Sequence, residues 1–172
     1  MPRYSRWAAL ITPVLLLMGC RPSSPSSAPW RVDLNAAGPV SFGASLREAA
    51  IALRDSSSDT TSGCSLWRPT HAPPGLTLMV EKGVVARVDV DSPGVRTLHD
   101  LQVGSAASAV REAFGAELSA EPHKYLWDAG WQYLTVRSSD AIHGLVFEVD
   151  SHVVRSYRAG LWPAVGYVER CS

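Results

Sequence analysis

The chain has 172 residues, and its 16 basic and 16 acidic side chains give a formal net charge of zero. A chain of this length forms one domain, or two small units that share a core. Nucleic-acid-binding proteins need a basic face that neutralises phosphates, and a near-neutral chain does not supply one. The composition therefore argues against a nucleic-acid partner.

Residues 1–19 have the pattern of a bacterial secretion signal. Two arginines precede an apolar run, Trp7–Met18, which is too short to span a bilayer by itself. The run ends in Leu17–Cys20 (LMGC), which resembles the lipobox, where the signal is cut before the cysteine and the thiol is lipidated. The resemblance implies that Cys20 carries acyl chains, enough for stable anchoring. The alternative is an ordinary signal peptide with a chance cysteine.

Residues 20–38 form a tether that begins with the Pro- and Ser-rich stretch Arg21–Pro29. Proline and serine bury little apolar area, so this stretch should stay extended and solvated. An arginine, not an aspartate, follows Cys20. By the usual bacterial sorting pattern, this implies anchoring in the outer membrane with the domain on the periplasmic side. Retention in the inner membrane is the alternative.

Residues 39–98 predict a first unit made of a short strand, a helix and an antiparallel meander. Ser45 and Glu48 have the spacing of a capping box, which places the helix start. Apolar and polar residues alternate on both sides of a turn in Leu76–Val90, which is typical of a β-hairpin.

The same pattern returns in residues 99–172, and we infer an internal duplication. We expect an α+β fold of two tandem strand–helix–antiparallel-meander units, with paired or juxtaposed sheets and the helices on one face. In the second unit Ser105 is the expected helix N-cap. Three strand regions and a hairpin are expected: Tyr125–Trp127, Trp131–Val136, the hairpin Leu145–Tyr157, and a closing strand over Ala164–Val168.

The cysteines predict one disulfide. If Cys20 is lipidated, only Cys64 and Cys171 remain, and two thiols in an oxidising compartment most simply pair. The bond would close a loop of roughly 100 residues, which favours a stabilising role. The alternative is two free thiols. A redox-active pair is less expected because the chain has no C-x-x-C motif.

Four stretches carry a family resemblance: Pro73–Val90, Pro122–Tyr125 (PHKY), Leu145–Asp150 (LVFEVD) and Tyr167–Cys171 (YVERC). They resemble a family of uncharacterised secreted lipoproteins of proteobacteria. The resemblance covers about residues 39–172. It implies a location and a fold, and it supplies no activity and no catalytic residue.

A second, looser likeness lies at the two helix starts, Phe42–Ser45 and Val103–Ser105. Both are similar to the strand–Gly–helix opening of SmpA/OmlA-type outer-membrane assembly lipoproteins and of tandem-repeat β-lactamase inhibitor proteins. Both copies lack the Met-Thr that usually follows the glycine in the assembly lipoproteins. The likeness implies a sheet surface that binds another protein.

An aromatic cluster around residues 122–133 is the best candidate for a binding surface. Aromatic side chains supply large contact area, and Lys124 adds a charge. Trp131 and Tyr133 share one strand face, and Gln132 and Leu134 share the other, so we expect one pair to be exposed. The alternative is that the aromatics fill the core. The candidate binding residues are His123, Lys124, Tyr125, Trp127, Trp131 and Tyr133.

Catalytic and metal motifs give weaker signals. The chain has no G-x-S-x-G, no H-E-x-x-H and no phosphate-binding glycine loop. Asp89, Asp91 and Asp100 form the densest acidic group, which is better interpreted as solvated turn carboxylates than as a calcium loop.

A group of arginines near the second hairpin is a candidate anion site. Arg155 and Arg158 lie close to Arg137 and could bind a carboxylate or phosphate. The alternative, which we favour, is outward strand residues paired with Glu148 or Glu169.

We therefore expect a lipid-anchored envelope lipoprotein whose domain is a non-catalytic protein-binding module, of the assembly-factor or enzyme-inhibitor type. A glycan- or peptidoglycan-binding module that uses the Trp127–Tyr133 aromatics is the alternative. A hydrolase without a readable motif is the third hypothesis. We expect no cofactor, no metal and no nucleic-acid partner.

Overall fold

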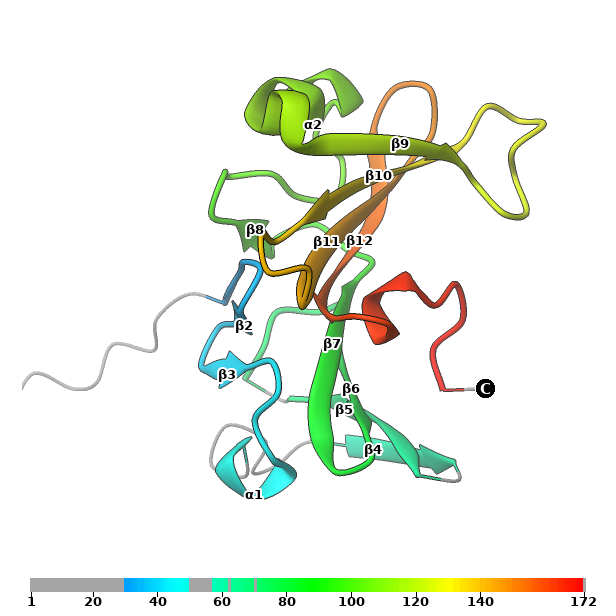
Figure 1. Cartoon of the computed structure of the whole chain (residues 1–172). Coiled ribbons are helices and arrows are strands. Elements are labelled where there is room, and N and C mark those ends of the chain that lie inside the picture. The colour runs from blue at the N-terminus through cyan, green and yellow to red at the C-terminus, as the bar shows by residue number, and fades with distance from the viewer. Residues whose placement is uncertain (1–29, 50–56, 62, 70, 172) are drawn as a thin grey trace, which may run out of the picture.

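The computed structural model describes residues 30–49, 57–61, 63–69 and 71–171 (Figure 1). The predicted signal peptide, the lipidated Cys20 and the tether up to residue 29 lie outside the described residues.

An eight-stranded sheet dominates the molecule. All neighbouring strands are antiparallel, and β7 and β12 form the central pair that joins the first half of the chain to the second. Their antiparallel pairing brings Gly160 against β7, where a Cβ atom would lie 2.2 Å from the Ala86 carbonyl oxygen. In spatial order the strands are β4 (Ser57–Thr61), β5 (Cys64–Arg68), β6 (Leu76–Glu81), β7 (Val84–Val90), β12 (Val154–Leu161), β11 (His143–Val149), β10 (Gln132–Arg137) and β9 (Leu118–Pro122).

A second, four-stranded sheet and the helices complete the described fold. The small sheet has the order β3-β2-β1-β8, and only its β1–β8 pair is parallel. The fold is therefore mostly β, with short helices, which agrees with the α+β class in its antiparallel sheet. The remaining elements are β1 (Arg31–Val32), β2 (Ala36–Ala37), β3 (Val40–Ser41), α1 (Leu46–Ala49), β8 (Arg96–Thr97), α2 (Ala107–Phe114) and the 3₁₀ turns η1 (Gly115–Glu117) and η2 (Ala164–Gly166).

The main apolar core lies on one face of the large sheet, where it meets the small sheet and the helices. Leu78, Phe147 and Tyr157 are fully buried there, and the rings of Phe147 and Tyr157 lie 5.7 Å apart. The Tyr157 hydroxyl donates to the Val95 carbonyl oxygen at 3.0 Å, and burial raises the pKa of this phenol. The alternation that predicts the two hairpins therefore places these side chains in one core.

The opposite face of the large sheet is covered by the last residues of the chain. We call residues 162–171 the C-terminal strap; its 3₁₀ turn buries Ala164 and Val165 against the sheet (Figure 1, red). A disulfide joins Cys171 to Cys64 on β5, which confirms the predicted pair. The bond ties the end of the second half of the chain to the first half.

The strap is not the closing strand that we expected over Ala164–Val168. Both sheet edges, β4 and β9, lie away from the central strands that the strap crosses. Its carbonyl groups instead accept hydrogen bonds from buried arginines on the sheet face. An extended strand would direct only alternate carbonyls toward that face.

The two helices begin in the same way at the large sheet. In each case a glycine and the next residue form an antiparallel bridge with the first residues of a hairpin's second strand. The bonds are Gly43 N to Val85 O and Val85 N to Ala44 O, and Gly104 N to Val154 O and Val154 N to Ser105 O, each 2.8 Å long.

The cap of α1 is the one that we predicted, and the cap of α2 is not. Ser45 and Glu48 form the predicted capping box: the Ser45 amide donates to the Glu48 carboxylate at 2.7 Å, and the Glu48 amide donates to Ser45 Oγ at 3.2 Å. Ser105 does not cap α2. Its hydroxyl accepts the Gln102 amide at 3.0 Å, and Ala106, which has no capping side chain, takes the N-cap position.

Candidate functional site

The two most exposed large apolar side chains of the described residues after 98, Trp127 and Tyr125, lie on the turn between β9 and β10. We call residues 124–130 the aromatic loop. It projects beyond the end of the sheet (Figure 1, yellow). The expected strand Tyr125–Trp127 lies in this turn, so that prediction is wrong; the strand that pairs with β10 is β9, which ends at Pro122.

His123 holds the base of the aromatic loop and explains why these residues turn. Its Nδ1 accepts the amide hydrogens of Tyr125 at 3.1 Å and Leu126 at 3.2 Å. The imidazole therefore carries its hydrogen on Nε2, which lies 3.8 Å from the Glu148 carboxylate. The ring is buried and stacks on Tyr133 with 4.5 Å between centroids. A strand could not direct two successive amides at one side chain.

The loop presents its apolar groups to solvent. Tyr125, Leu126 and Trp127 are 55%, 39% and 66% exposed. The Tyr125 hydroxyl donates to the Glu169 carboxylate of the C-terminal strap at 2.7 Å, so the start of the loop is also fastened to the strap. Large apolar side chains grouped on an ordered projection are typical of an interaction site.

A groove of about 430 Å³ runs between the loop and the strap. Tyr167 of the strap, 39% exposed, extends the aromatic surface beside it. The groove is shallow and open, which suits a side chain of a partner better than an enclosed small molecule. Its lining residues are Lys124, Gly166, Tyr167, Val168, Glu169 and Arg170.

The six predicted binding residues differ in their exposure to solvent. Lys124, Tyr125 and Trp127 are exposed, Trp131 is half-buried, and His123 and Tyr133 are buried. The expectation that one strand pair faces solvent is wrong. Tyr133 lies on the face covered by the strap and Leu134 lies in the main core, so both faces of β10 are covered. Burial and the nearby Glu148 carboxylate raise the pKa of Tyr133.

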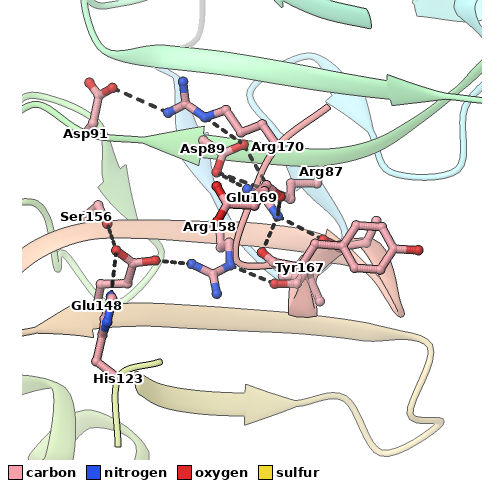
Figure 2. Close-up of polar contacts among 12 residues, drawn as sticks. Arg87, Asp89, Asp91, His123, Glu148, Ser156, Arg158, Tyr167, Glu169 and Arg170 are labelled. Atoms are coloured by element: carbon pink, nitrogen blue, oxygen red, sulfur yellow. Dashed lines mark hydrogen bonds and ion pairs between the residues drawn. The ribbon is translucent and has the colours of Figure 1, made fainter. Parts of the chain in front are cut away.

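Beneath the strap lies a charged cluster that alternation did not reveal (Figure 2). Arg87 of β7 is 1% exposed and donates to both oxygens of Asp89, with a shortest distance of 2.7 Å. Its Nη1 also donates to the carbonyl oxygens of Ala164 at 3.0 Å and Tyr167 at 2.7 Å. Arg87 therefore fastens the strap to the sheet.

Arg158 of β12 does the same from the second half of the chain. Its Nε donates to the Val165 carbonyl oxygen at 2.7 Å, and its Nη1 donates to Glu148. Glu148 also accepts the Ser156 hydroxyl at 2.9 Å. The alternative that paired Arg158 with Glu148 is confirmed, although Arg158 is buried and not outward as we expected.

The cluster surrounds a cavity of about 210 Å³ that reaches Arg170. His123, Glu148 and Ser156 meet here, but Glu148 lies between the other two. A nucleophile–base relay needs the imidazole between the hydroxyl and the carboxylate. These three side chains are therefore not arranged as a relay: Ser156 donates to Glu148, and His123 lies beside that carboxylate.

The predicted arginine group does not assemble. Arg155 pairs with Asp150 in an exposed turn, and the Arg137 guanidinium lies 3.7 Å from the Trp162 ring centroid. Backbone hydrogen bonds from Val153 and His152 to Asp150 lower the pKa of that carboxyl to about 2, and Arg155 adds to the effect.

The acidic residues weighed as calcium ligands are also separated. Asp89 pairs with Arg87, and Asp100 lies 2.9 Å from the Arg31 guanidinium. Across residues 30–49, 57–61, 63–69 and 71–171, no group of three or more His, Cys, Asp or Glu side chains is arranged to hold a metal ion.

The charged cluster had a signal in the sequence that we did not use. Arg87 and Asp89 occupy the polar positions of a strand whose other residues are Val and Ala. Opposite charges two residues apart point to the same face of a strand, so they can pair there when that face is covered.

Comparisons with known proteins give the chain no family. No protein-family model and no curated protein matches it. Its fold is similar to the crystal structure of the uncharacterized protein yfeY from Escherichia coli, with a TM-score of 0.44 and 12% sequence identity over 76% of this chain and 99% of that one. Among the described residues, no helix has the length and apolar character needed to cross a membrane.

Proposed function

We propose that the protein is a lipid-anchored lipoprotein of the bacterial outer membrane that binds a protein partner through the aromatic loop. The observation that carries this proposal is the grouping of Tyr125, Leu126 and Trp127 on a projection that His123 and Glu169 hold in place. Interfaces are enriched in Tyr and Trp, and an anchored loop loses little conformational entropy on binding.

The position of the first described residues supports an orientation in which the aromatic loop points away from the membrane. The described chain begins at β1, on the opposite side of the molecule from the aromatic loop (Figure 1). With an anchor at Cys20 of the predicted lipobox, the loop would face away from the bilayer, toward periplasmic partners. The module would act by binding, as an assembly factor or an enzyme inhibitor does.

The tandem duplication that we infer accounts for the architecture. Both helix starts make the same bridge, and both hairpins carry a β-bulge at the matching position, after Met79 in β6 and after Glu148 in β11. The central β7–β12 pair places Asp89 opposite Arg158. These are matching positions of the two hairpins, so a pseudo-two-fold axis passes between them.

Affinity capture with matched variants tests the binding proposal. The full chain with its disulfide formed is immobilised, and envelope extract is passed over it. Trp127→Ala should abolish retention of a dominant partner, because interface hot spots are commonly Trp. Leu98→Ala removes a comparably exposed apolar side chain (59%, against 66% for Trp127) on another part of the surface, and this variant should still retain the partner.

The result that would overturn the proposal is retention by the Trp127→Ala variant equal to that of the wild type. An extract from which the wild-type chain retains no protein would also overturn it. Both variants remove exposed side chains, so their unfolding midpoints should match that of the wild type.

Glycan binding is the second candidate, favoured by the open face of Trp127. Sugar rings stack on exposed aromatic faces, and Trp127 and Tyr125 offer two of them. Muropeptides that quench tryptophan fluorescence in the wild type and not in Trp127→Ala would favour this candidate over a protein partner.

Mass spectrometry tests the anchor separately. Expression of the full chain in a bacterium should yield a product that begins at Cys20 and carries the mass of its acyl chains. Cys20→Ala should yield no lipidated product. A wild-type chain that is secreted without lipid would contradict the anchoring proposal and leave the binding proposal intact.

A further inference from the structure

The surface around the aromatic loop carries more acid than base. Glu121 at the end of β9, Asp128 in the loop and Glu169 in the strap are all exposed. Lys124 is the only base that the described loop itself holds. Three carboxylates and one ammonium give this surface a net charge of about −2, which attracts a cationic partner.

Two of these carboxylates are without internal partners. Within the described part of the chain, the side-chain carboxylates of Glu121 and Asp128 make no hydrogen bond or ion pair. Glu169 accepts the neutral Tyr125 hydroxyl, which leaves its charge uncompensated. Since charges that serve folding are normally paired or solvated singly, three beside one apolar projection favour an intermolecular role.

The neighbouring cations do not neutralise this group. Arg170 lies at the groove, but its guanidinium is directed to Asp89 at 3.6 Å and Asp91 at 3.5 Å. The Lys124 ammonium lies 5.3 Å from the centre of the Tyr125 ring, within reach of the ring's negative face. Arg158 is buried and pairs with Glu148.

We propose that the segment recognised by the aromatic loop is a basic, arginine-bearing stretch of a protein. This inference rests on the proposed function and names the chemistry of its partner. A guanidinium stacks flat on an aromatic ring and pairs with a carboxylate through two parallel hydrogen bonds. Trp127 offers the exposed ring, and Asp128 offers a carboxylate on the adjacent residue of the loop. Arginine fits this arrangement better than lysine, whose ammonium is a compact point charge.

A library of random peptides displayed on phage tests the proposal against the immobilised full chain. The peptides selected by the wild type should be enriched in arginine, and their binding should weaken as salt is raised. The double variant Glu121→Lys/Asp128→Lys should bind the selected peptides about tenfold more weakly and should itself select peptides without arginine enrichment.

Glu112→Lys/Glu117→Lys is the matched control, with the same change in net charge. Both glutamates are exposed, and they lie in α2 and η1, beyond the far end of β9 from the loop. This control should select arginine-rich peptides as the wild type does, since its charges lie more than a Debye length from the loop tip.

The outcomes separate this inference from the proposed function. Selected peptides that need Trp127 but show no arginine enrichment would overturn the basic-segment inference and support a protein-binding loop. Equal loss of binding in the control double variant would also overturn it. If Trp127→Ala selects the same peptides as the wild type, the proposed function itself fails.

Discussion

The two faces of the eight-stranded sheet are both buried, but different chemistry holds the cover on each. On one face Leu78, Phe147 and Tyr157 pack against the small sheet and the helices. On the other, the C-terminal strap is fastened by Arg87 and Arg158 through its own carbonyl groups. The apolar face depends on shape and area, whereas the charged face depends on every partner being present.

This difference explains how a short segment can cover a sheet with only two small apolar clusters beneath it. The strap has few large apolar side chains to bury, so area alone would stabilise it weakly. Arginine brings up to five donors to one place, and Arg87 uses them on Asp89 and on the strap backbone. Burial of the Arg87–Asp89 ion pair is tolerated here because Arg87 also donates to the Ala164 and Tyr167 carbonyl oxygens.

The two largest expected effects are one on each face, and the first is at Arg87, where the charged face should depend on its ion pair. Arg87→Ala leaves the buried Asp89 with only the longer Arg170 contact at 3.6 Å and removes the donor from the strap carbonyls. We expect a loss of about 3–5 kcal/mol in the free energy of unfolding, measured with urea. The double variant Arg87→Met/Asp89→Leu should lose less than Arg87→Ala alone. A double variant that is the less stable of the two would contradict this account of the face.

On the apolar face, the free energy of unfolding should depend on side-chain volume. Phe147→Ala opens a cavity among fully buried side chains and should cost about 3–5 kcal/mol in the free energy of unfolding. Phe147→Leu, which keeps most of the volume, should cost clearly less. Equal losses for both replacements would mean that this face does not depend on packing, and the contrast between the faces would fail.

The disulfide adds a covalent fastening to the charged face alone. Cys64→Ala/Cys171→Ala opens a cross-link between residues 107 positions apart. We expect a loss of about 2–4 kcal/mol in the free energy of unfolding. Because Arg87 still binds the strap carbonyls, exchange of the hydrogen-bonded Gly166 and Tyr167 amides should stay slow in the double variant. Fast exchange there would show that the disulfide, and not Arg87, keeps the strap in place.

The smallest expected effect is at Asp150, a carboxylate outside both faces. Its pKa is lowered to about 2 in the folded chain, so it stabilises the fold above the ordinary carboxyl pKa of 3.8, and this contribution is lost as pH falls toward 2. Asp150→Asn should therefore lower the urea midpoint at pH 5 and have a much smaller effect at pH 2, where the folded carboxyl is about half protonated. A midpoint difference that is as large at pH 2 as at pH 5 would assign the effect to geometry and not to charge.

The sequence predicts the apolar face well because that face is governed by local patterns. Alternation places the Leu76–Val90 hairpin as β6 and β7, and the Ser45–Glu48 spacing sets the start of α1. The disulfide follows from cysteine number and compartment alone. Each of these signals is a rule about neighbours or about counting, and neither kind needs tertiary contacts.

The strap and the aromatic loop depend on contacts between distant residues, which no local pattern records. The segment Ala164–Val168 has the composition of a strand, and only the buried arginines explain why it turns. Tyr125–Trp127 likewise has high strand propensity. It forms a turn because the Tyr125 and Leu126 amides both donate to the His123 imidazole. Tertiary hydrogen bonds override propensity in both places. The six candidate binding residues were therefore predicted as a group, while their division into exposed and buried was not predicted.

The central strand pair also bears on how such a chain could arise. In a dimer of two identical units, a residue on the two-fold axis faces its own copy, and two like charges there would repel. In the duplication that we infer, positions 89 and 158 share that axis within one polypeptide and hold an aspartate and an arginine. Only after fusion could each copy mutate separately. The charged cluster, and the fastening of the chain end that depends on it, is thus a feature that a symmetric ancestor could not have had.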